Sequence, residues 1–498
     1  MGQKARVIMI QGTMSNAGKS VIAAGLCRIF SDDGYKTVPF KSQNMALNSY
    51  VTKEGLEMGR AQVMQAECAR TEASVLMNPI LLKPTSDMGS QVIVNGRSVG
   101  NMKAMDYFRN KKNYVKDIME AYDKLAAVND IIVVEGAGSP VELNLKKDDI
   151  VNMGLAKMLD APVLLVGDID RGGVFAQLLG TLDLLEEEER KRVKGLIVNK
   201  FRGDSRLFED GVKILEERGK TKVLGVVPYM QVKLDDEDSL SERFGNREVK
   251  AFDIAVIRPA HISNYTDFDT FEQTEGISLR YVSHPYELGD PDIIILPGTK
   301  NTIDDLRKIK KDGMAEVIKN KAASGTCIFG ICGGYQMLGR KISDPHGTES
   351  GGSEEGIGLL PVDTVLEDEK ILTEYSGKIT GADGVLEGIG NCSIKGYEIH
   401  TGSTRPYEEL CEFTAGGTGY CRGNVYGTYI HGFFDKKEIC VSVLESVARQ
   451  RRKKINTASI SDYNIFKERQ YDILAKGLRE SLDMDRIYEI MGLSNGKK

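Results

Sequence analysis

The sequence predicts an α/β protein built from two parallel-sheet units, with a helical stretch near its C-terminal end. Three observations carry this prediction. A β-type run at residues 6–11 leads through a glycine-rich loop into a helix-like segment, and a second strand–turn–helix pattern occupies residues 322–339. Several unbroken, β-branched apolar runs lie between the two patterns. Such runs are typical of parallel strands that are buried on both faces.

Composition narrows the class of protein further. Of 498 residues, 41% are hydrophobic and 28% are charged, as in ordinary globular proteins with an ample core. The formal net charge of −6 argues against general nucleic-acid binding. No apolar stretch approaches the length of a membrane span, and a strand beginning by residue 6 leaves no room for a signal peptide. The eight cysteines show no zinc-ligand spacing. We therefore expect a cytoplasmic protein with no membrane or nucleic-acid partner, whose oligomeric state the sequence leaves open.

The patterns also predict where the domains begin and end. The residues that follow the last strand of the first unit are acidic and show no periodicity, which is typical of a linker. A new β-type strand starts at Phe252, and apolar residues at helical spacing fill 463–491. The predicted parts are a first domain at 1–230, a linker at 231–250, a second domain at 251–437 and a helical extension at 438–498.

The first glycine-rich loop has the pattern of a phosphate-binding loop. Residues 12–20 read GTMSNAGKS, between a strand and a helix. Loop N–H groups and the helix N-terminus would face the phosphates of ATP, Lys19 would reach the β/γ oxygens, and the Ser20 hydroxyl would ligate Mg²⁺. The spacing between the two glycines is one residue longer than in the common P-loop and resembles that of dethiobiotin synthetase and its relatives. The predicted nucleotide-binding residues in the loop are Gly12, Thr13, Gly18, Lys19 and Ser20.

Polar residues stand at the carboxyl ends of three further predicted strands, where open α/β sheets bind ligands. Glu135 ends the run 130–135 and is predicted to be an Mg²⁺ ligand. Asn199 and Lys200 end another strand, and we expect them near the adenine edge and the ribose. The acids at 168 and 170 follow a strand in the same way, but strand-end capping is an open alternative for them.

The second strand–turn–helix pattern indicates a nucleophile elbow. Cys332 stands between Gly330 and the pair Gly333–Gly334, directly after an apolar strand. A nucleophile at such a turn has strained backbone, so its neighbours must be almost free of side chains. The helix that follows directs its positive dipole end at the sulfur and stabilises a thiolate. Cys327, inside the strand, is interpreted as an ordinary core cysteine.

A catalytic thiolate also needs a base and an oxyanion hole. His431, at the end of a β-rich run and followed by a glycine, is the predicted base among five histidines. The N–H of Gly333 is one predicted oxyanion donor. Gly298, in the loop that follows the apolar strand at 292–296, is predicted to supply the second.

These segments resemble a class I, triad-type glutamine amidotransferase domain. The resemblance implies that Cys332 attacks the amide of glutamine, releases ammonia and leaves a glutamyl thioester for water to hydrolyse. Most members of that class carry a glutamate two residues after the histidine, where this chain has Phe433. That departure resembles the branch of the class that works in cobalamin synthesis. It leaves the group that orients His431 undetermined, with Glu398 as a candidate.

A glutaminase joined to an ATP site implies that ATP activates a carboxylate as an acyl phosphate, which ammonia converts into an amide. Spacing and composition do not name the acceptor. Eight further segments, however, resemble signature blocks of the cobyric acid synthase family, in family order: residues 39–45, 59–62, 77–84, 90–93, 135–140, 168–173, 198–204 and 296–302. This resemblance implies amidation of the b, d, e and g carboxylates of adenosylcobyrinic acid a,c-diamide to give adenosylcobyric acid. It also implies a P-loop domain followed by an amidotransferase domain and a helical tail.

The resemblance also suggests residues for the acceptor. In dethiobiotin synthetase relatives, a lysine at the place of Lys41 faces the acceptor, and Gln43 and Asn44 follow it. The alternative for these three residues is a turn with a helix cap. Asp148 and Asp149 are weaker candidates, because a solvated charge run explains them equally well.

Two other functions stay open at this point. One is a related amide-forming enzyme, such as cobyrinic acid a,c-diamide synthase or an enzyme that acts on a cell-wall precursor. The other is a P-loop switch ATPase whose second domain has lost activity, for which the intact Cys332 and His431 are unexpected.

Overall fold

The computed structural model describes residues 5–86, 89–234, 245 and 248–494. The chain forms two compact units. Unit 1 comprises Met1–Ala46, Met58–Asp238 and Lys467–Lys498, and unit 2 comprises Leu47–Glu57 and Ser239–Phe466. This division differs from the predicted boundaries in two segments. Residues 47–57 belong to unit 2, and the end of the predicted helical extension belongs to unit 1. Most of the predicted linker, at 235–244 and 246–247, lies outside the described residues.

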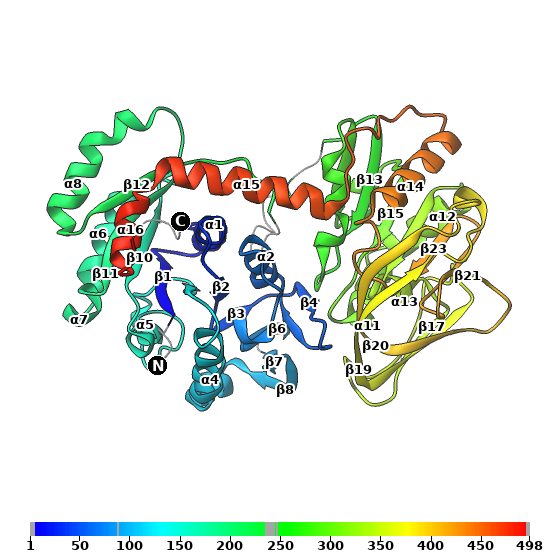
Figure 1. The fold of residues 1–498 in the computed structure, drawn as a ribbon. Helices are drawn as coiled ribbons and strands as arrows, with labels where there is room; N and C mark the ends of the chain where they lie inside the picture. Colours follow the sequence, from blue (N-terminus) through cyan, green and yellow to red (C-terminus); the bar gives the residue numbers. More distant parts are fainter. Residues whose placement is uncertain (1–4, 87–88, 235–244, 246–247, 495–498) are drawn as a thin grey trace. The chain divides into compact units, whose positions relative to one another are not determined.

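The centre of unit 1 is a six-stranded parallel sheet (Figure 1). Its strands are short, β-branched and almost fully buried, as predicted for a sheet covered on both faces. In spatial order they are β12 (Val223–Pro228), β11 (Val193–Phe201), β10 (Val163–Asp168), β1 (Arg6–Gly12), β9 (Ile131–Glu135) and β2 (Thr37–Phe40).

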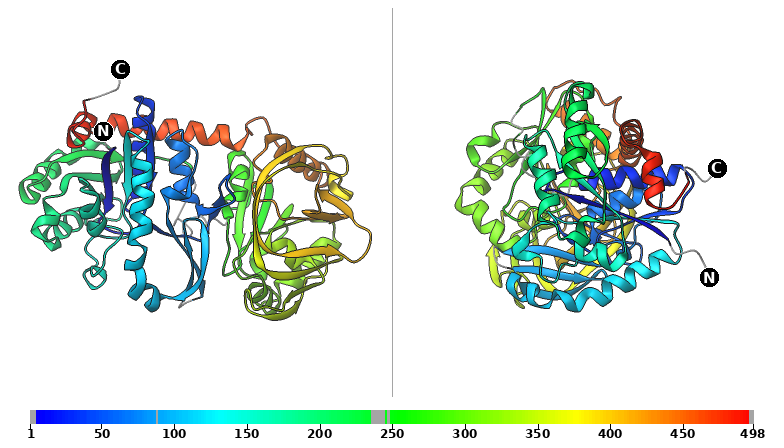
Figure 2. Two further views of the ribbon diagram at one scale, coloured as in Figure 1. Left: turned by 60° about the horizontal axis from the view of Figure 1, so that its bottom comes forward. Right: turned by 90° about the vertical axis from the view of Figure 1, so that its left-hand side faces the viewer.

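Helices cover both faces of this sheet. Alternate strand residues such as Ile8 and Leu164 share one core with α1 (Lys19–Asp32), with α16 (Met484–Ile490) and with the part of α15 (Tyr463–Ser481) that belongs to unit 1 (Figures 1 and 2). Gly167 faces the opposite side, against Leu178 of α6 (Val174–Leu184). The remaining helices of unit 1 are α2 (Arg60–Cys68), α3 (Ala104–Asn110), α4 (Val115–Ala126), α5 (Met153–Leu159), α7 (Glu187–Arg190) and α8 (Glu209–Gly219).

Unit 1 carries a second, four-stranded sheet inserted between β2 and β9 of the chain. Its first pair is parallel and the other two pairs are antiparallel. The strands are β3 (Gln43–Met45), β6 (Ile80–Ser86), β7 (Gly89–Val94) and β8 (Arg97–Lys103), and β5 (Glu57–Gly59) lies between β3 and β6 along the chain.

Unit 2 is built on a seven-stranded sheet whose first five strands are parallel and whose last two form antiparallel pairs. The parallel part positions the second candidate site, since its strands all end at one edge. In spatial order the strands are β14 (Ile277–Val282), β13 (Phe252–Ile257), β15 (Ile293–Leu296), β16 (Cys327–Ile331), β23 (Val425–Thr428), β22 (Gly419–Arg422) and β21 (Cys411–Thr414).

A second sheet of unit 2 contains the long hairpin β19–β20 (Figure 2). Its strands are β18 (Gly352–Glu355), β17 (Lys341–Asp344), β19 (Val362–Lys378) and β20 (Ser393–Pro406), and β4 (Ser49–Val51) packs on β20 through Val51. The helices are α10 (Pro285–Leu288), α11 (Thr302–Lys311), α12 (Met314–Ala323), α13 (Gly333–Leu338) and α14 (Lys437–Gln450), with a 3₁₀ helix, η5 (Tyr265–Gln273).

The predicted α/β class is therefore confirmed, including the helical C-terminal part. The predicted helical stretch at 463–491 is divided into α15 and α16, because Asp483 caps the second helix by accepting a hydrogen bond from the N–H of Arg486. In the part of the chain that the structure describes, no helix is both long and apolar enough to cross a bilayer.

Candidate active sites

Cys332 occupies a sharp turn between β16 and α13 in unit 2. Its backbone dihedrals are φ 53° and ψ −112°, a conformation that costs a non-glycine residue about 1–3 kcal/mol. Its N–H donates to the carbonyl of Thr428 at the end of β23, at 2.8 Å, which fixes the turn to the neighbouring strand. The strain predicted for a nucleophile elbow is thus present at the predicted residue.

The glycines around Cys332 are required by close backbone approach. A Cβ at Gly334 would overlap the carbonyl oxygen of Leu296 in β15, and one at Gly330 would lie 2.7 Å from the backbone nitrogen of Tyr335. The turn can therefore pack against β15 and against its own helix α13 only without side chains at these positions.

His431 lies beside Cys332, three residues after the end of β23. Both side chains are buried, and Cys332 lies near enough to affect the pKa of the imidazole. The thiol itself donates to the carbonyl of Ile399 at 3.6 Å. On its other side, Nδ1 of His431 lies 2.7 Å from Oδ2 of Asp267 in η5. The second oxygen of Asp267 accepts the N–H of Gly432 at 3.0 Å. Cys332, His431 and Asp267 therefore form a relay in which the imidazole lies between the sulfur and a carboxylate that is held at both oxygens.

The charge of Asp267 dominates the electrostatics of the imidazole. Burial by itself lowers the pKa of His431, but the charge of Asp267, the hydrogen bond that its carboxylate accepts and the neighbouring Cys332 raise this pKa to about 10. The ring of Tyr397 stacks on the imidazole with centroids 5.2 Å apart. The site consequently favours a protonated imidazole next to the sulfur, which is the partner that a thiolate needs.

The structure explains why Phe433, and not a glutamate, stands two residues after His431. Phe433 is 1% exposed and packs against Phe329, Phe413 and Phe434, so this position belongs to the aromatic core. Glu398 does not take over the orienting role, contrary to the candidate assignment. Its carboxylate lies 3.2 Å from Nε2 of His400. The orienting contact is made by Asp267, from a different element.

Asp267 is not among the residues predicted from the sequence, although the sequence contains a signal for it. Asp267 stands in the run YTDFDTF, where acids alternate with aromatic residues. Charged residues in a segment that must bury its aromatics are unusual without a partner. Gln336 of α13 was also missed: its amide is buried and donates to the carbonyl of Thr401 at 3.0 Å, beside the elbow.

The two predicted oxyanion donors lie in adjacent backbone segments. Gly333 is in the first turn of α13, where N–H groups have no acceptor within the helix. A Cβ on Gly333 would approach the backbone nitrogen of Thr299 to 3.2 Å, and a Cβ on Gly298 would approach Cε1 of His431 to 3.2 Å. The loop with Gly298 thus lies between the elbow and the imidazole, in a position to serve the same reacting carbonyl.

In unit 1, the predicted phosphate loop connects β1 to α1. Lys19 is the first residue of α1, and its Nζ donates to the carbonyls of Met14 and Gly138, both at 3.1 Å. Gly18 has φ +100°, and a Cβ there would overlap the side-chain amide of Asn199. The loop is therefore held by its own lysine and by the neighbouring strand β11. Thr13 donates from Oγ1 to Oε1 of Gln177 at 3.2 Å, and a Cβ on Gly12 would press on the Lys19 side chain.

Glu135, at the carboxyl end of β9, is the centre of a buried polar cluster. Its Oε1 accepts from Ser20 Oγ at 2.8 Å and from Lys41 Nζ at 3.1 Å, and its Oε2 accepts from Gln65. Burial tends to raise the pKa of this carboxyl, but Lys41, Gln65, Ser20 and Lys19 together bring the pKa below its ordinary value. The carboxylate is thus ionised, and with the Ser20 hydroxyl it offers two adjacent hard oxygens of the kind that Mg²⁺ prefers.

Asn199 and Lys200 both contact the phosphate loop. Asn199 donates from Nδ2 to the carbonyl of Ala17 at 2.9 Å, and Lys200 donates to the carbonyl of Asn16 at 2.7 Å and to Oδ2 of Asp168 at 2.9 Å. Their predicted roles at the adenine and the ribose stay predictions.

The three candidate acceptor residues lie at the end of β2 and in β3. Lys41 is buried against Glu135, Gln43 accepts from the hydroxyl of Tyr107 at 2.6 Å, and Asn44 donates to Gln62 at 2.9 Å. Gln43 and Asn44 are strand residues rather than parts of a turn and helix cap. Asp149 accepts backbone N–H groups at 151, 152 and 154, so it is a loop-capping residue.

The two units thus define a class of protein: a P-loop nucleotide-binding unit and a glutamine amidotransferase unit in one chain. Comparison with known proteins supports this class. Residues 6–236 match a family described as an AAA domain, and residues 253–439 match the CobB/CobQ-like glutamine amidotransferase domain. A solved glutamine amidotransferase matches 39% of this chain and 98% of its own at 17% identity, with a TM-score of 0.31, too distant to argue from.

Full-length relatives narrow the class to one family. The cobyric acid synthase of Lachnoclostridium phytofermentans is 52% identical over 98% of this chain and 99% of its own length. That of Ruminiclostridium cellulolyticum is 51% identical over 99% of this chain and 98% of its own. The chain belongs to the cobyric acid synthase family. It is a glutamine-dependent, ATP-using ligase that forms amides in cobalamin biosynthesis.

Proposed function

We propose that this enzyme amidates the b, d, e and g carboxylates of adenosylcobyrinic acid a,c-diamide to give adenosylcobyric acid. The observation that carries the proposal is the Cys332–His431–Asp267 relay, present in a chain whose other unit holds a complete phosphate loop. Full-length similarity to cobyric acid synthases supports the acceptor. Glutamine would supply the nitrogen, and ATP would supply the driving force.

The glutaminase half follows from the relay. The Cys332 thiolate attacks the carboxamide carbon of glutamine while the protonated imidazole of His431 stands ready to give its proton to the leaving nitrogen. Asp267 is a positioning residue that fixes the ring through Nδ1. The backbone at Gly333 and Gly298 stabilises the oxyanion. Ammonia leaves, and water then hydrolyses the glutamyl thioester to glutamate.

The ligase half follows from the cluster around Glu135. An acceptor carboxylate oxygen attacks the γ-phosphorus of ATP, so that an acyl phosphate forms and ADP leaves. Ammonia then attacks the acyl carbon, phosphate departs, and one proton is lost as the amide forms. Lys19 would neutralise charge on the transferred group, and Lys41, which contacts Glu135, would hold the acceptor carboxylate.

Mg²⁺, when bound between Ser20 and Glu135, would neutralise charge on the phosphate oxygens. The oxygen pair at 2.8 Å fits such an ion, because one oxygen is a carboxylate and the other a hydroxyl at the start of α1. Lys41 contacts the same oxygen, Oε1, that accepts from Ser20, and Gln65 contacts the other.

Mass spectrometry of the corrinoid tests the proposal. Adenosylcobyrinic acid a,c-diamide is incubated with the full-length protein, glutamine, ATP and Mg²⁺, and each component is omitted in turn. We expect four carboxylate-to-amide conversions that require both ATP and a nitrogen source. An unchanged corrinoid with glutamine still hydrolysed would refute the acceptor and redirect the search to another acid. An unchanged corrinoid without glutamine hydrolysis, together with ATP-dependent dimerisation, would favour a P-loop switch protein.

A further inference from the structure

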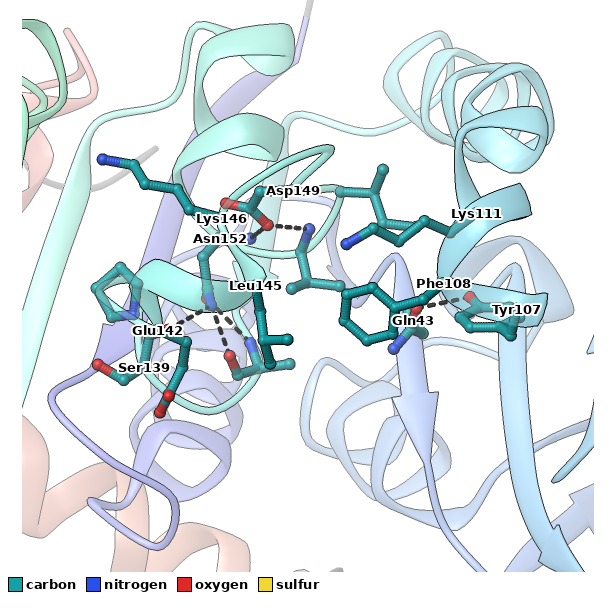
Figure 3. A pocket seen from close by; sticks show the side chains of 14 residues that line it. Gln43, Tyr107, Phe108, Lys111, Ser139, Glu142, Leu145, Lys146, Asp149 and Asn152 are labelled. Atoms are coloured by element: carbon teal, nitrogen blue, oxygen red, sulfur yellow. Dashed lines mark hydrogen bonds between the residues drawn. The ribbon is translucent and has the colours of Figure 1, made fainter. Parts of the chain in front are cut away.

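Unit 1 contains a pocket that the reaction described above does not yet use (Figure 3). One wall carries Gln43 of β3, Tyr107 and Phe108 of α3, and Lys111 just after α3. The facing wall is formed by the loops that follow β9, at residues 137–152. Figure 3 shows the Lys111 side chain extending into the space between these two walls.

The pocket adjoins the phosphate site through a shared loop. Gly138 offers its carbonyl to Lys19 at 3.1 Å, while the next residues, Ser139 and Pro140, line the pocket. The Asn152 side chain holds this loop by donating to the carbonyls of Ala137 and Ser139 at 2.6 and 3.2 Å. A molecule in the pocket is therefore separated from the phosphate-binding lysine by a single, firmly held loop.

Lys111 is a buried cation for which the described residues supply no ion-pair partner. The residue is only 7% exposed, and its Nζ lies 4.3 Å from the centroid of the Phe108 ring. Within the described residues, no hydrogen bond or ion pair is found for its ammonium group. The nearby Asp148 pairs with Lys112, and Asp149 is committed to backbone N–H groups. Burial lowers the pKa of Lys111, and Asp149 and Asp148 offset only part of that effect. An anion in the pocket would supply the missing partner.

The rim of the pocket adds exposed apolar surface to this charge. Phe108 is 39% exposed and Leu145, on the facing wall, is 42% exposed. Exposed apolar side chains gathered around a buried cation fit a ligand that is itself partly apolar and carries carboxylates.

We propose that this pocket binds the acceptor of the amidation, with Lys111 pairing with one of its carboxylates and Phe108 packing on its apolar surface. The inference rests on the proposed function, since it assigns the acceptor of that reaction to a place. Lys41 is already bound to Glu135 and would serve the carboxylate under attack. Lys111 then binds a different carboxylate of the same acceptor and fixes the orientation of the acceptor in the pocket.

The test compares Lys111→Met with the matched variant Lys112→Met, in the full-length protein. Lys112 is the next residue, exposed and paired with Asp148, so it controls for loss of positive charge in the same segment. The readouts are KM for the corrinoid, KM for ATP, the rate of glutamine hydrolysis and Tm. We expect Lys111→Met to raise the corrinoid KM by about 10- to 100-fold, with KM for ATP and the glutaminase rate unchanged. Lys112→Met should leave all four readouts close to wild type.

Stability separates this role from a structural one. Replacing an unpaired buried ammonium with an apolar side chain of similar length should leave Tm unchanged or raise it. A lowered Tm with an unchanged corrinoid KM would overturn the proposal, as would equal effects of the two variants. Phe108→Ala provides a second test, with a raised corrinoid KM again expected. If the wild-type protein amidates no corrinoid, the proposed function itself fails; if it does and Lys111→Met behaves like wild type, only the pocket assignment fails.

Discussion

The two candidate sites are built in different ways at the same kind of place, the carboxyl ends of parallel strands. In unit 2, the reactive groups form one line, from the strained Cys332 through His431 to Asp267, and the backbone around them is packed too tightly for side chains. In unit 1, Glu135 is the centre of a cluster in which Ser20, Lys41 and Gln65 all share one carboxylate.

The difference fits the chemistry that we propose for each site. Covalent catalysis needs one sulfur at one angle to one imidazole, so a rigid line with a strained turn is suitable. Phosphate and metal binding needs several charged groups and hydrogen-bond donors that act together. A cluster provides them, and the loss of one group leaves the others in place. Substitutions in the line should therefore have abrupt effects on glutamine use, whereas substitutions in the cluster should affect only the ATP-dependent step.

The largest effect is expected when the nucleophile, Cys332, is replaced. Cys332→Ala should lower glutamine hydrolysis by more than about 10⁵-fold, because no other group can form the thioester. Amide formation with added ammonium salt should continue. Release of glutamate and of amidated product, assayed separately, gives both rates. Cys327→Ala, in the buried strand that leads into the turn of Cys332, is the control and should keep its glutaminase activity. Retained glutamine hydrolysis in Cys332→Ala would remove the nucleophile assignment.

The second test concerns the predicted ATP site of unit 1. Lys19→Ala should lower ATP-dependent amidation by about 10³-fold from either nitrogen source, since the charge on the transferred phosphoryl group loses its main cation. Glutamine hydrolysis measured without ATP should stay near wild type. Undiminished amidation in this variant would show that the loop between β1 and α1 does not bind the reacting phosphates.

The third test concerns Asp267, which the sequence did not predict as part of the site. Asp267→Asn should slow glutamine hydrolysis by about 10²- to 10³-fold, because the amide no longer fixes the imidazole tautomer and no longer stabilises its positive charge. The pKa of His431, about 10 in the native protein, should fall. The alkaline limb of the pH–rate profile should then shift to lower pH. Glu398→Gln is the control, since that carboxylate contacts His400. An unshifted alkaline limb would rule out Asp267 as the orienting residue.

The same contact has a consequence for stability. A raised pKa in the folded state stabilises the protein fully below the ordinary pKa of histidine, near 6.5, and this contribution is lost as the pH rises toward 10. The difference in unfolding free energy between wild type and Asp267→Asn should therefore be larger at pH 6 than at pH 10. A pH-independent difference in chemical denaturation would contradict this assignment.

The smallest effect concerns Phe433, two residues after His431. Phe433→Leu should lower the unfolding free energy by about 1–2 kcal/mol through lost aromatic packing, with little change in glutaminase rate. Denaturation and glutamate release measured on the same preparation would separate the two. A large kinetic defect without destabilisation would mean that Phe433 acts on the imidazole after all.

Much of the fold could be predicted from the sequence, because parallel strands buried on both faces leave unbroken apolar runs, as at β9 and β10. Cys332, Lys19 and Glu135 could be proposed from the sequence because a local pattern surrounds each one. Asp267 was not, since no local pattern links it to His431, and the two residues meet only through the tertiary fold. Lys111 was missed for a related reason: an isolated lysine in a charged segment gives no sign that folding will bury it.

The most direct measurement of the central claim follows nitrogen from glutamine into the product. Wild type and Cys332→Ala are each incubated with the corrinoid, ATP, Mg²⁺, glutamine labelled with ¹⁵N in its amide, and unlabelled ammonium, and the product is analysed by mass spectrometry. The account predicts ¹⁵N in the new amides of the wild-type product and only unlabelled amides from Cys332→Ala. Labelled amides from the variant would contradict it, because glutamine nitrogen would then reach the acceptor without Cys332.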